Sequence, residues 1–104
     1  MTNRTEQYFI PASDEHMARE RNKARELRRS QWWKNKTGQG RCHYCERRFH
    51  PRELTMDHVV PLIRGGRTAR SNVVPCCGEC NANKKDLIPV EWEAYLAGLQ
   101  RSGE

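Results

Sequence analysis

The segment from residue 42 to residue 85 decides the fold, and it reads CHYCERRFHPRELTMDHVVPLIRGGRTARSNVVPCCGECNANKK. Two Cys-x-x-Cys pairs stand near its ends, Cys42 with Cys45 and Cys77 with Cys80. Each pair can present two thiolates from one tight turn, and two such pairs complete a tetrahedral four-cysteine site. The sequence therefore predicts a structural Zn²⁺ and leaves the polar residues between and after the pairs free for chemistry.

The fifth cysteine, Cys76, and two nearby histidines, His43 and His50, are further residues that could bind the zinc. We interpret Cys76 as a core thiol, because Cys77 preserves the two-residue gap to Cys80. His43 and His50 are interpreted as surface residues, since four cysteines already fill a tetrahedral site. The alternative is a set of buried thiols without metal. An odd number of cysteines in short paired spacings favours metal ligands in a reducing compartment over disulfides.

Length and charge narrow the class of protein. A chain of 104 residues with 36% hydrophobic and 31% charged residues is expected to form one domain without a large apolar core. The net charge of +6 favours a polyanionic partner, with nucleic acid ahead of an anionic membrane surface. No stretch approaches the roughly 18 apolar residues of a membrane span, and no apolar signal segment opens the chain. We therefore expect a cytoplasmic protein with no membrane association.

The N-terminal region is expected to be helical after an extended arm over residues 1–12. Ser13 can cap a basic helix over residues 13–36, with Asp14 and Glu15 complementing the dipole of its first turn. Pairs at i,i+3 are expected between Glu20 and Lys23 and between Glu26 and Arg29. His16 is interpreted as a solvated helix residue. Of Trp32 and Trp33, one is interpreted as a core residue and the other as a lid; the alternative is that they are platforms on which bases stack.

The remaining elements follow from composition and turn residues. An apolar, β-branched stretch predicts a strand over 54–62, and the glycine-containing loop 64–67 precedes a second strand over 72–76. A helix is expected from about 78 to 86. Pro89 suits the first turn of a last helix over 89–99.

Four polar residues stand between the cysteine pairs or directly after them: Asp57, His58, Asn72 and Asn81. With this order and spacing, and with the trailing Lys84, residues 41–87 resemble the HNH endonuclease family. The resemblance implies an α+β fold with a ββα-metal (His-Me finger) core, in which two strands and one helix clasp a divalent cation at the scissile phosphate. Together with the length of the chain, which allows only one domain, it predicts that residues 1–104 form a single nuclease domain.

The resemblance assigns a role to each of the four residues. Asp57 and Asn81 match the ligands of the catalytic cation, and His58 matches the general base. Asn72 matches the middle Asn, which supports the active-site loop and orients the histidine. Asn81 stands where many members carry the final histidine of the HNH name. The implied products are a 5′-phosphate and a 3′-hydroxyl.

The chemistry of these residues supports the same assignment without the family. A carboxylate oxygen of Asp57 suits Mg²⁺ or Mn²⁺, and the imidazole of His58 can take a proton from water near neutral pH. Adjacent strand residues point to opposite faces, so the two side chains can share a cleft only if the backbone bends there. An isolated Asp-His pair is usually structural, but Asn72, Asn81 and the zinc frame favour catalysis.

Basic residues predict where DNA binds. Nine Lys and Arg lie from Arg19 to Arg41 against Glu20 and Glu26. Such a helix is often merely solvated, yet the excess positive charge can grip phosphates. The predicted DNA-binding residues lie in this helix, in the loop after the first strand and after Asn81: Arg25, Arg28, Arg29, Arg64, Arg67, Arg70, Lys84 and Lys85.

The sequence thus predicts a monomeric, metal-dependent endonuclease that nicks or cuts DNA with low sequence specificity. Its cofactors are a structural Zn²⁺ and a catalytic Mg²⁺ or Mn²⁺. The alternative is a catalytically silent zinc module that binds nucleic acid or a protein partner in a phage or restriction assembly. The intact set of Asp57, His58, Asn72 and Asn81 favours the enzyme.

Overall fold

The computed structural model describes residues 10–102, and the side chains of residues 10–99. Most of the predicted N-terminal arm, residues 1–9, therefore lies outside the described residues. The elements follow one another along the chain as α2 (Asp14–Arg28), α3 (Gln31–Gly38), η1 (Pro51–Glu53), β1 (Thr55–His58), η2 (Leu62–Arg64), β2 (Val73–Cys76), α4 (Gly78–Lys84) and α5 (Pro89–Ser102).

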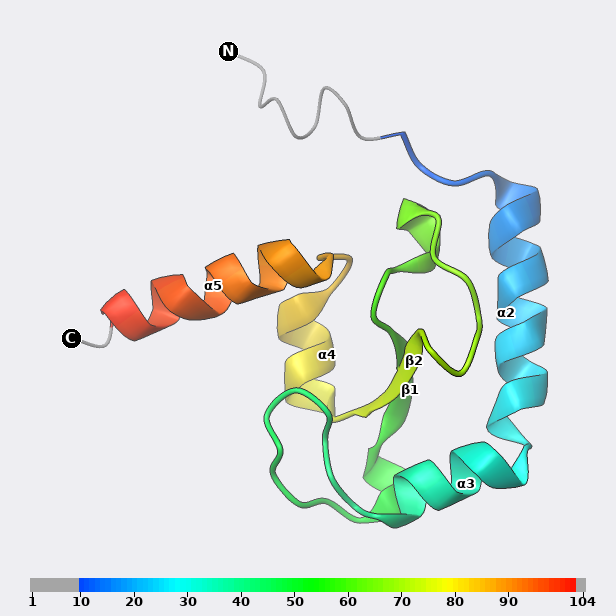
Figure 1. Ribbon diagram of the computed structural model, residues 1–104, viewed down its shortest axis with the longest axis horizontal. Coiled ribbons are helices and arrows are strands. Elements are labelled where there is room, and N and C mark those ends of the chain that lie inside the picture. Colours follow the sequence, from blue (N-terminus) through cyan, green and yellow to red (C-terminus); the bar gives the residue numbers. More distant parts are fainter. Residues whose placement is uncertain (1–9, 103–104) are drawn as a thin grey trace.

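The centre of the molecule is a ββα unit. Strands β1 and β2 pair in antiparallel register, with Thr55 opposite Cys76 and His58 opposite Val73, and α4 follows β2 directly. Helix α2 stands beside this unit, α3 crosses one end of it, and α5 extends away from it (Figure 1). The predicted α+β class with a small ββα core is confirmed.

The first strand is shorter than the sequence predicts. We expected it over residues 54–62, but β1 ends at His58 and the chain bends at Val59 and Val60. The side chain of Asn72 explains the end, because its amide accepts from the Val60 N–H at 2.9 Å and donates to the Val60 carbonyl at 3.1 Å. Both backbone groups of Val60 are thus bound to a side chain, and Pro61 follows.

The basic region forms two helices, so the prediction of one helix over 13–36 was wrong. The Ser13 hydroxyl caps α2 by accepting from the His16 N–H, as expected. A second serine, Ser30, has an extended backbone and accepts from the Trp33 N–H at 3.2 Å, which starts α3. Serine favours this N-cap position because its oxygen satisfies a free N–H of the first turn.

The loop between η2 and β2 folds back against the end of β1. Gly65 makes the turn with φ +89°, a conformation that glycine adopts at little cost. At Gly66 the backbone of the loop lies against the backbone of Val60. A Cβ atom at this position would be 1.8 Å from the Val60 carbonyl oxygen, so only glycine fits. The two glycines therefore set the path of residues 65–72, which lie beside α2 (Figure 1).

Candidate metal centre and active-site cleft

The four predicted zinc ligands meet at one point. Cys42, Cys45, Cys77 and Cys80 bring their sulfur atoms within 4.8 Å of one another, and the sulfurs of Cys45 and Cys77 are 3.9 Å apart. Tetrahedral zinc with bonds of about 2.3 Å requires sulfurs roughly 3.8 Å apart, so the donor set fits zinc. Cys42, Cys77 and Cys80 also form the buried cluster of the domain together with Leu54 and Cys76, and the half-buried Cys45 packs against this cluster.

Cys76 lies outside the metal cluster, as predicted. It is fully buried, and its thiol donates to the Cys77 carbonyl at 3.4 Å. Burial raises the pKa of Cys76 to about 12. Geometry separates it from the ligands, because its sulfur is not one of the four that lie within 4.8 Å of one another. His43 and His50 are exposed, and His50 caps η1 through its ring nitrogen. The interpretation of both histidines as surface residues is confirmed.

Arg47 supports the metal site from outside. Its Nε donates to the Cys45 sulfur at 3.4 Å, and its terminal nitrogen lies 2.6 Å from a carboxylate oxygen of Glu79. Partial burial raises the pKa of Cys45, but hydrogen bonds from the Arg47 side chain and backbone outweigh it and lower the pKa to about 6. The thiolate that a metal requires is thereby favoured near neutral pH.

The turn from Cys42 to Cys45, which we call the metal knuckle, also reaches Asp57 through one of its residues. The hydroxyl of Tyr44 donates to Oδ2 of Asp57 at 2.6 Å. The ammonium of Lys84 lies 3.2 Å from the same oxygen and donates to the His58 carbonyl at 3.3 Å. Among the described residues, Oδ1 of Asp57 has no hydrogen-bond or ion-pair partner. One oxygen of this carboxylate is therefore fixed by the protein while the other is available to a cation.

Asp57, His58 and Asn81 line one cleft of about 420 Å³. The sequence left open whether neighbours in a strand could share a cleft, and they do so where β1 ends and the chain bends. Asn81 comes from α4, one residue after the last cysteine. Arg21 of α2 and Lys85 at the end of α4 line the same cleft. Hard oxygen donors, an imidazole and two cationic side chains thus surround one space.

The imidazole of His58 is half-buried and held from one side. Its Nε2 lies 2.9 Å from the hydroxyl of Thr68. Burial lowers the pKa of His58, and the negative charge of Asp57 opposes this shift. The neutral ring, which is the form that accepts a proton, is therefore favoured at neutral pH.

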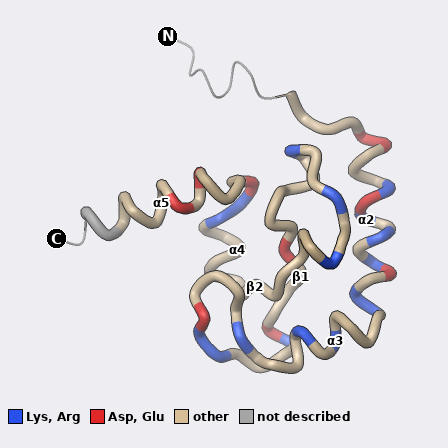
Figure 2. The backbone as a smooth tube through the Cα atoms, in the orientation of Figure 1, with Lys and Arg blue, Asp and Glu red and all other residues tan. Residues whose placement is uncertain are grey.

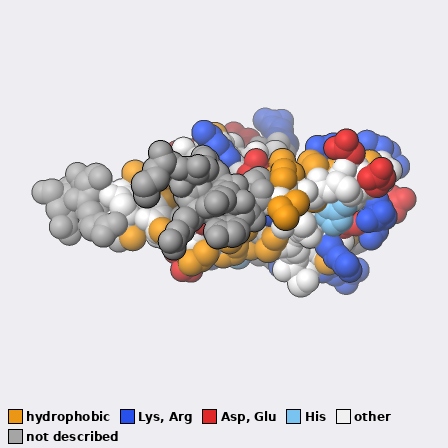
Figure 3. Space-filling view, turned by 90° about the horizontal axis from the view of Figure 1, so that it is seen from above, with side chains coloured by type: hydrophobic (Ala, Val, Ile, Leu, Met, Phe, Trp, Pro, Cys, Tyr) orange, Lys and Arg blue, Asp and Glu red, His pale blue; other side chains and the backbone are white. Residues whose placement is uncertain are grey.

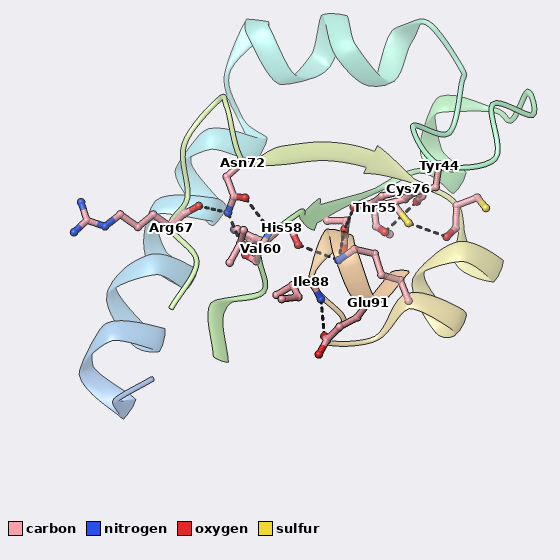
Figure 4. Close-up of polar contacts among 12 residues, drawn as sticks. Tyr44, Thr55, His58, Val60, Arg67, Asn72, Cys76, Ile88 and Glu91 are labelled. Atoms are coloured by element: carbon pink, nitrogen blue, oxygen red, sulfur yellow. Dashed lines mark hydrogen bonds and ion pairs between the residues drawn. The ribbon is translucent and has the colours of Figure 1, made fainter. Parts of the chain in front are cut away.

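Asn72 supports the loop but does not touch the His58 ring. It binds both backbone groups of Val60, and its amide also donates to the Arg67 carbonyl at 2.7 Å (Figure 4). The backbone carbonyl of Asn72 accepts a hydrogen bond from the Val59 N–H at 2.9 Å. The support that we expected from Asn72 thus reaches the backbone on both sides of the loop, whereas the direct contact to His58 comes from Thr68.

Of the predicted DNA-binding residues, two are paired with acidic side chains of the protein and six are exposed. Lys84 is 1% exposed and faces Asp57, so its ammonium is not available to a phosphate, and that prediction was wrong. Arg64 makes a two-point ion pair with Glu91 at 3.0 and 3.3 Å. The others are exposed and follow α2, the loop after η2 and the end of α4 (Figure 2): Arg25, Arg28, Arg29, Arg67, Arg70 and Lys85.

The basic side chains gather at the α2 end of the molecule. At the end opposite α5, Figure 3 shows basic side chains interspersed with acidic ones and a histidine, and further basic side chains lie nearer the middle of this face. The guanidinium of Arg70 also lies over the ring of Trp32, 5.3 Å from its centre, while Trp33 is buried. Trp33 is thus a core residue, as predicted for one of the two, and Trp32 makes a cation–π contact with Arg70.

Several residues of this region were not identified from the sequence. His16 was interpreted as solvated, but it is half-buried and its Nε2 lies 2.8 Å from the Gly66 carbonyl. Glu20 is 2% exposed and accepts a hydrogen bond from the Thr68 N–H of the loop. Its predicted ion pair with Lys23 is present at 3.1 Å. The predicted Glu26–Arg29 pair is absent from the residues that the structure describes. The four-residue spacing of His16, Glu20 and Ala24 was the available signal, because it marks one helix face.

The fold and the two sites define a small α+β domain with a four-cysteine cluster that can hold a metal and a cleft lined by Asp57, His58 and Asn81. Residues 42–94 match the HNH endonuclease family, and the chain belongs to that family. No curated protein matches the chain. Within residues 10–102 no helix has the length and apolar character needed to cross a membrane.

Proposed function

We propose that this protein is a metal-dependent endonuclease that hydrolyses DNA phosphodiester bonds, by nicking or by double-strand cutting, with low sequence specificity. The observation that carries the proposal is the single cleft lined by Asp57, His58 and Asn81, with Arg21 and Lys85 beside them. A carboxylate, an amide and a neutral imidazole in one open cleft that two basic side chains also line suit hydrolysis of a polyanion.

The cleft offers ligands for a catalytic cation. Oδ1 of Asp57 and the side-chain oxygen of Asn81 would hold Mg²⁺ or Mn²⁺, which prefer oxygen ligands and keep several waters. When bound, the cation supplies positive charge next to the nonbridging and leaving oxygens of the phosphate. Tyr44 and Lys84 fix the other oxygen of Asp57, so the carboxylate is oriented before a cation arrives.

His58 takes the proton from the attacking water. Its lowered pKa keeps the ring neutral at pH 7, which is the form that a general base requires. Asn72 holds the chain where it bends after His58 and thereby keeps the ring at the mouth of the cleft. We expect the products to be a 5′-phosphate and a 3′-hydroxyl.

The exposed cations of α2 and of the loop after η2 bind the DNA backbone. They contact phosphates and therefore contribute affinity without reading bases. Arg67 and Arg70 lie in the same loop as Thr68, and Arg21 lines the cleft itself. The duplex is thus expected to lie across α2 and this loop, with the scissile phosphate at the cleft.

A catalytically silent zinc module is the second candidate, and one contact favours it. The ammonium of Lys84 already neutralises Asp57, which weakens the attraction of that carboxylate for a divalent cation. In this account the chain would still bind nucleic acid through its basic surface, but the cleft would hold no catalytic cation. The four-cysteine site would be the same in both accounts.

A plasmid-nicking assay separates the two candidates. Supercoiled plasmid is incubated with the zinc-loaded protein in Mg²⁺, in Mn²⁺ and in excess chelator, beside Asp57→Ala and Asn81→Ala. The endonuclease account predicts nicked or linear product with either cation, little with chelator, and partial rescue of the Asn81→Ala protein by raised Mn²⁺. Asp57→Ala is compared only if circular dichroism shows it folded, because this change leaves the buried Lys84 ammonium without its partner. Equal, cation-independent conversion by all proteins would instead indicate a contaminating nuclease and a silent module.

A further inference from the structure

A chain of hydrogen bonds joins His58 to helix α2. The Nε2 atom of His58 lies 2.9 Å from the Thr68 hydroxyl, and that hydroxyl donates to the backbone carbonyl of Glu20 at 2.7 Å. The Thr68 N–H donates to a carboxylate oxygen of Glu20 at 2.6 Å. Thr68 is therefore bound by Glu20 through both its backbone and its side chain.

The single hydroxyl proton of Thr68 decides the direction of the contact with His58. A threonine hydroxyl has one hydrogen and two lone pairs, and here the hydrogen points to the Glu20 carbonyl. Only a lone pair is left for His58, so the ring nitrogen must donate. In the neutral ring the proton then sits on Nε2, and the free lone pair is on Nδ1.

Helix α2 anchors the whole loop, and not Thr68 alone. Besides Glu20, His16 lies one turn earlier with its ring nitrogen 2.8 Å from the Gly66 carbonyl. Just before the helix, the Ala12 N–H donates to the Ile63 carbonyl at 2.8 Å. The Glu20 side chain is 2% exposed and is paired with Lys23, so it is held in place and charged. All these contacts come from residues that precede the segment matched to the family, which begins at residue 42.

We propose that Thr68 is a positioning residue that fixes the tautomer and the orientation of His58, and that α2 holds Thr68 in place through Glu20. The inference rests on the proposed function in taking His58 as the general base. It adds that Nδ1 is the nitrogen that takes the proton, and that a helix outside the matched segment completes the active site. Without the hydroxyl, the ring is free to turn and to exchange tautomers.

Nuclear magnetic resonance of ¹⁵N-labelled, zinc-loaded protein tests the assignment without relying on activity. Long-range ¹H–¹⁵N correlations distinguish a protonated ring nitrogen from an unprotonated one, and a His58→Ala spectrum assigns the His58 signals. The wild type and Thr68→Ser are expected to show a protonated Nε2, whereas Thr68→Val shows a mixture of both tautomers. A protonated Nδ1 in the wild type, or an unchanged tautomer in Thr68→Val, would overturn the proposal.

Cleavage kinetics provide the second measurement. Loss of a partner that fixes a histidine tautomer typically costs about 10- to 100-fold, so we expect Thr68→Val to lose that factor in kcat with KM nearly unchanged. Thr68→Ser should restore the rate. Thr55→Val is the matched control, because the Thr55 hydroxyl also donates to a backbone carbonyl, that of Cys76, at 3.2 Å. Wild-type kcat in Thr68→Val, or an equal loss in Thr55→Val, would contradict the positioning role.

The outcomes also separate this inference from the proposed function. If His58→Ala cleaves as fast as the wild type, the proposed function fails, whatever tautomer the spectra show. If cleavage requires His58 but Thr68→Val keeps both the tautomer and the rate, the function stands and the role of Thr68 fails. Zinc content and circular dichroism of each variant identify any protein that is simply misfolded.

Discussion

The ammonium of Lys84 lies 3.2 Å from Oδ2 of Asp57, and both side chains are almost fully buried. Tyr44 donates to the same oxygen, so three elements converge on one carboxylate: the metal knuckle, β1 and α4. Such a pair is stabilising only when both charges are present, because a single buried charge lacks compensation. The candidate cation ligand is therefore part of the core of the domain as well as part of the cleft.

Lys84→Met should destabilise the protein strongly. Removing one partner of a buried ion pair costs about 3–5 kcal/mol, because the remaining charge is left unpaired. Urea unfolding of the zinc-loaded protein without other divalent cations measures the loss. Lys85→Met is the control, since Lys85 is the exposed neighbour and should change stability by less than about 0.5 kcal/mol. Similar losses in both variants would show that the Lys84–Asp57 pair contributes nothing specific.

Loss of the four-cysteine metal should unfold the central domain. Structural zinc in small modules contributes roughly 10 to 16 kcal/mol of apparent binding free energy, as much as or more than the roughly 5 to 15 kcal/mol of net stability of a typical domain. Cys42→Ser and Cys80→Ser should yield little soluble protein, whereas Cys76→Ser should keep one zinc per chain. Elemental analysis of the purified proteins checks this. A folded wild type without zinc, or a Cys76→Ser protein that alone lacks it, would refute the ligand assignment.

The sequence predicted the parts of the site that depend on short spacings. The two Cys-x-x-Cys pairs each lie within one turn, so the positions of their sulfurs follow from local geometry. The expectation that Asp57, His58 and Asn81 act together came from the resemblance to the HNH endonuclease family. Spacing alone left open whether Asp57 and His58 share a cleft, because neighbours in a strand point to opposite faces.

Other contacts depend on tertiary packing and could not be predicted from spacing. Lys84 was expected to contact DNA phosphates, and only the fold brings it to Asp57. Thr68 and Glu20 are 48 residues apart, and no local pattern predicts their hydrogen bond. The break between α2 and α3 did have a local signal, the N-cap residue Ser30, which the uniformly basic composition concealed.

Glu20 should make stability depend on pH in a defined direction. The hydrogen bond from the Thr68 N–H lowers the pKa of Glu20, against an opposing effect of burial. A depressed carboxyl pKa contributes stability that is fully present above the unfolded value of about 4.3 and is lost as pH falls through the folded value. Glu20→Gln should therefore be less stable by about 1.5 to 3 kcal/mol at pH 7, and the difference should shrink below about pH 4.

Parallel urea unfolding of the wild type and Glu20→Gln measures this difference. The comparison is restricted to pH values at which elemental analysis shows that both proteins keep their zinc, so that their difference isolates Glu20. Glu26→Gln is the matched control, because Glu26 is exposed on the same helix. A constant difference between pH 7 and the acid range would show that the charge of Glu20 is not what stabilises the loop.

DNA binding should be largely electrostatic and should fall steeply with salt. Each neutralised phosphate adds about 0.9 to the magnitude of the log–log salt slope on duplex DNA, so removing Arg25, Arg28 and Arg29 together should flatten it by up to about 2.7. Fluorescence anisotropy at several salt concentrations gives the slope. The double variant Arg48→Ala/Arg52→Ala, on the exposed surface near η1, is the control. An unchanged slope in the triple variant would mean that α2 presents a solvated face.

The central claim is that His58 acts as the general base of phosphodiester hydrolysis. A positioned base contributes about 10² to 10⁴ in rate, equivalent to roughly 3 to 5 kcal/mol of barrier. Its removal should leave zinc content and DNA affinity unchanged, because the four cysteines and the exposed cations are untouched.

Single-turnover cleavage of duplex DNA by wild type and His58→Ala, each in Mg²⁺ and in Mn²⁺, measures this contribution directly. Two independent preparations exclude a contaminating nuclease. The predicted result is cation-dependent cleavage by the wild type and a rate lower by about 10² to 10⁴ in His58→Ala, at equal DNA binding. Cleavage by His58→Ala at the wild-type rate would contradict the mechanism.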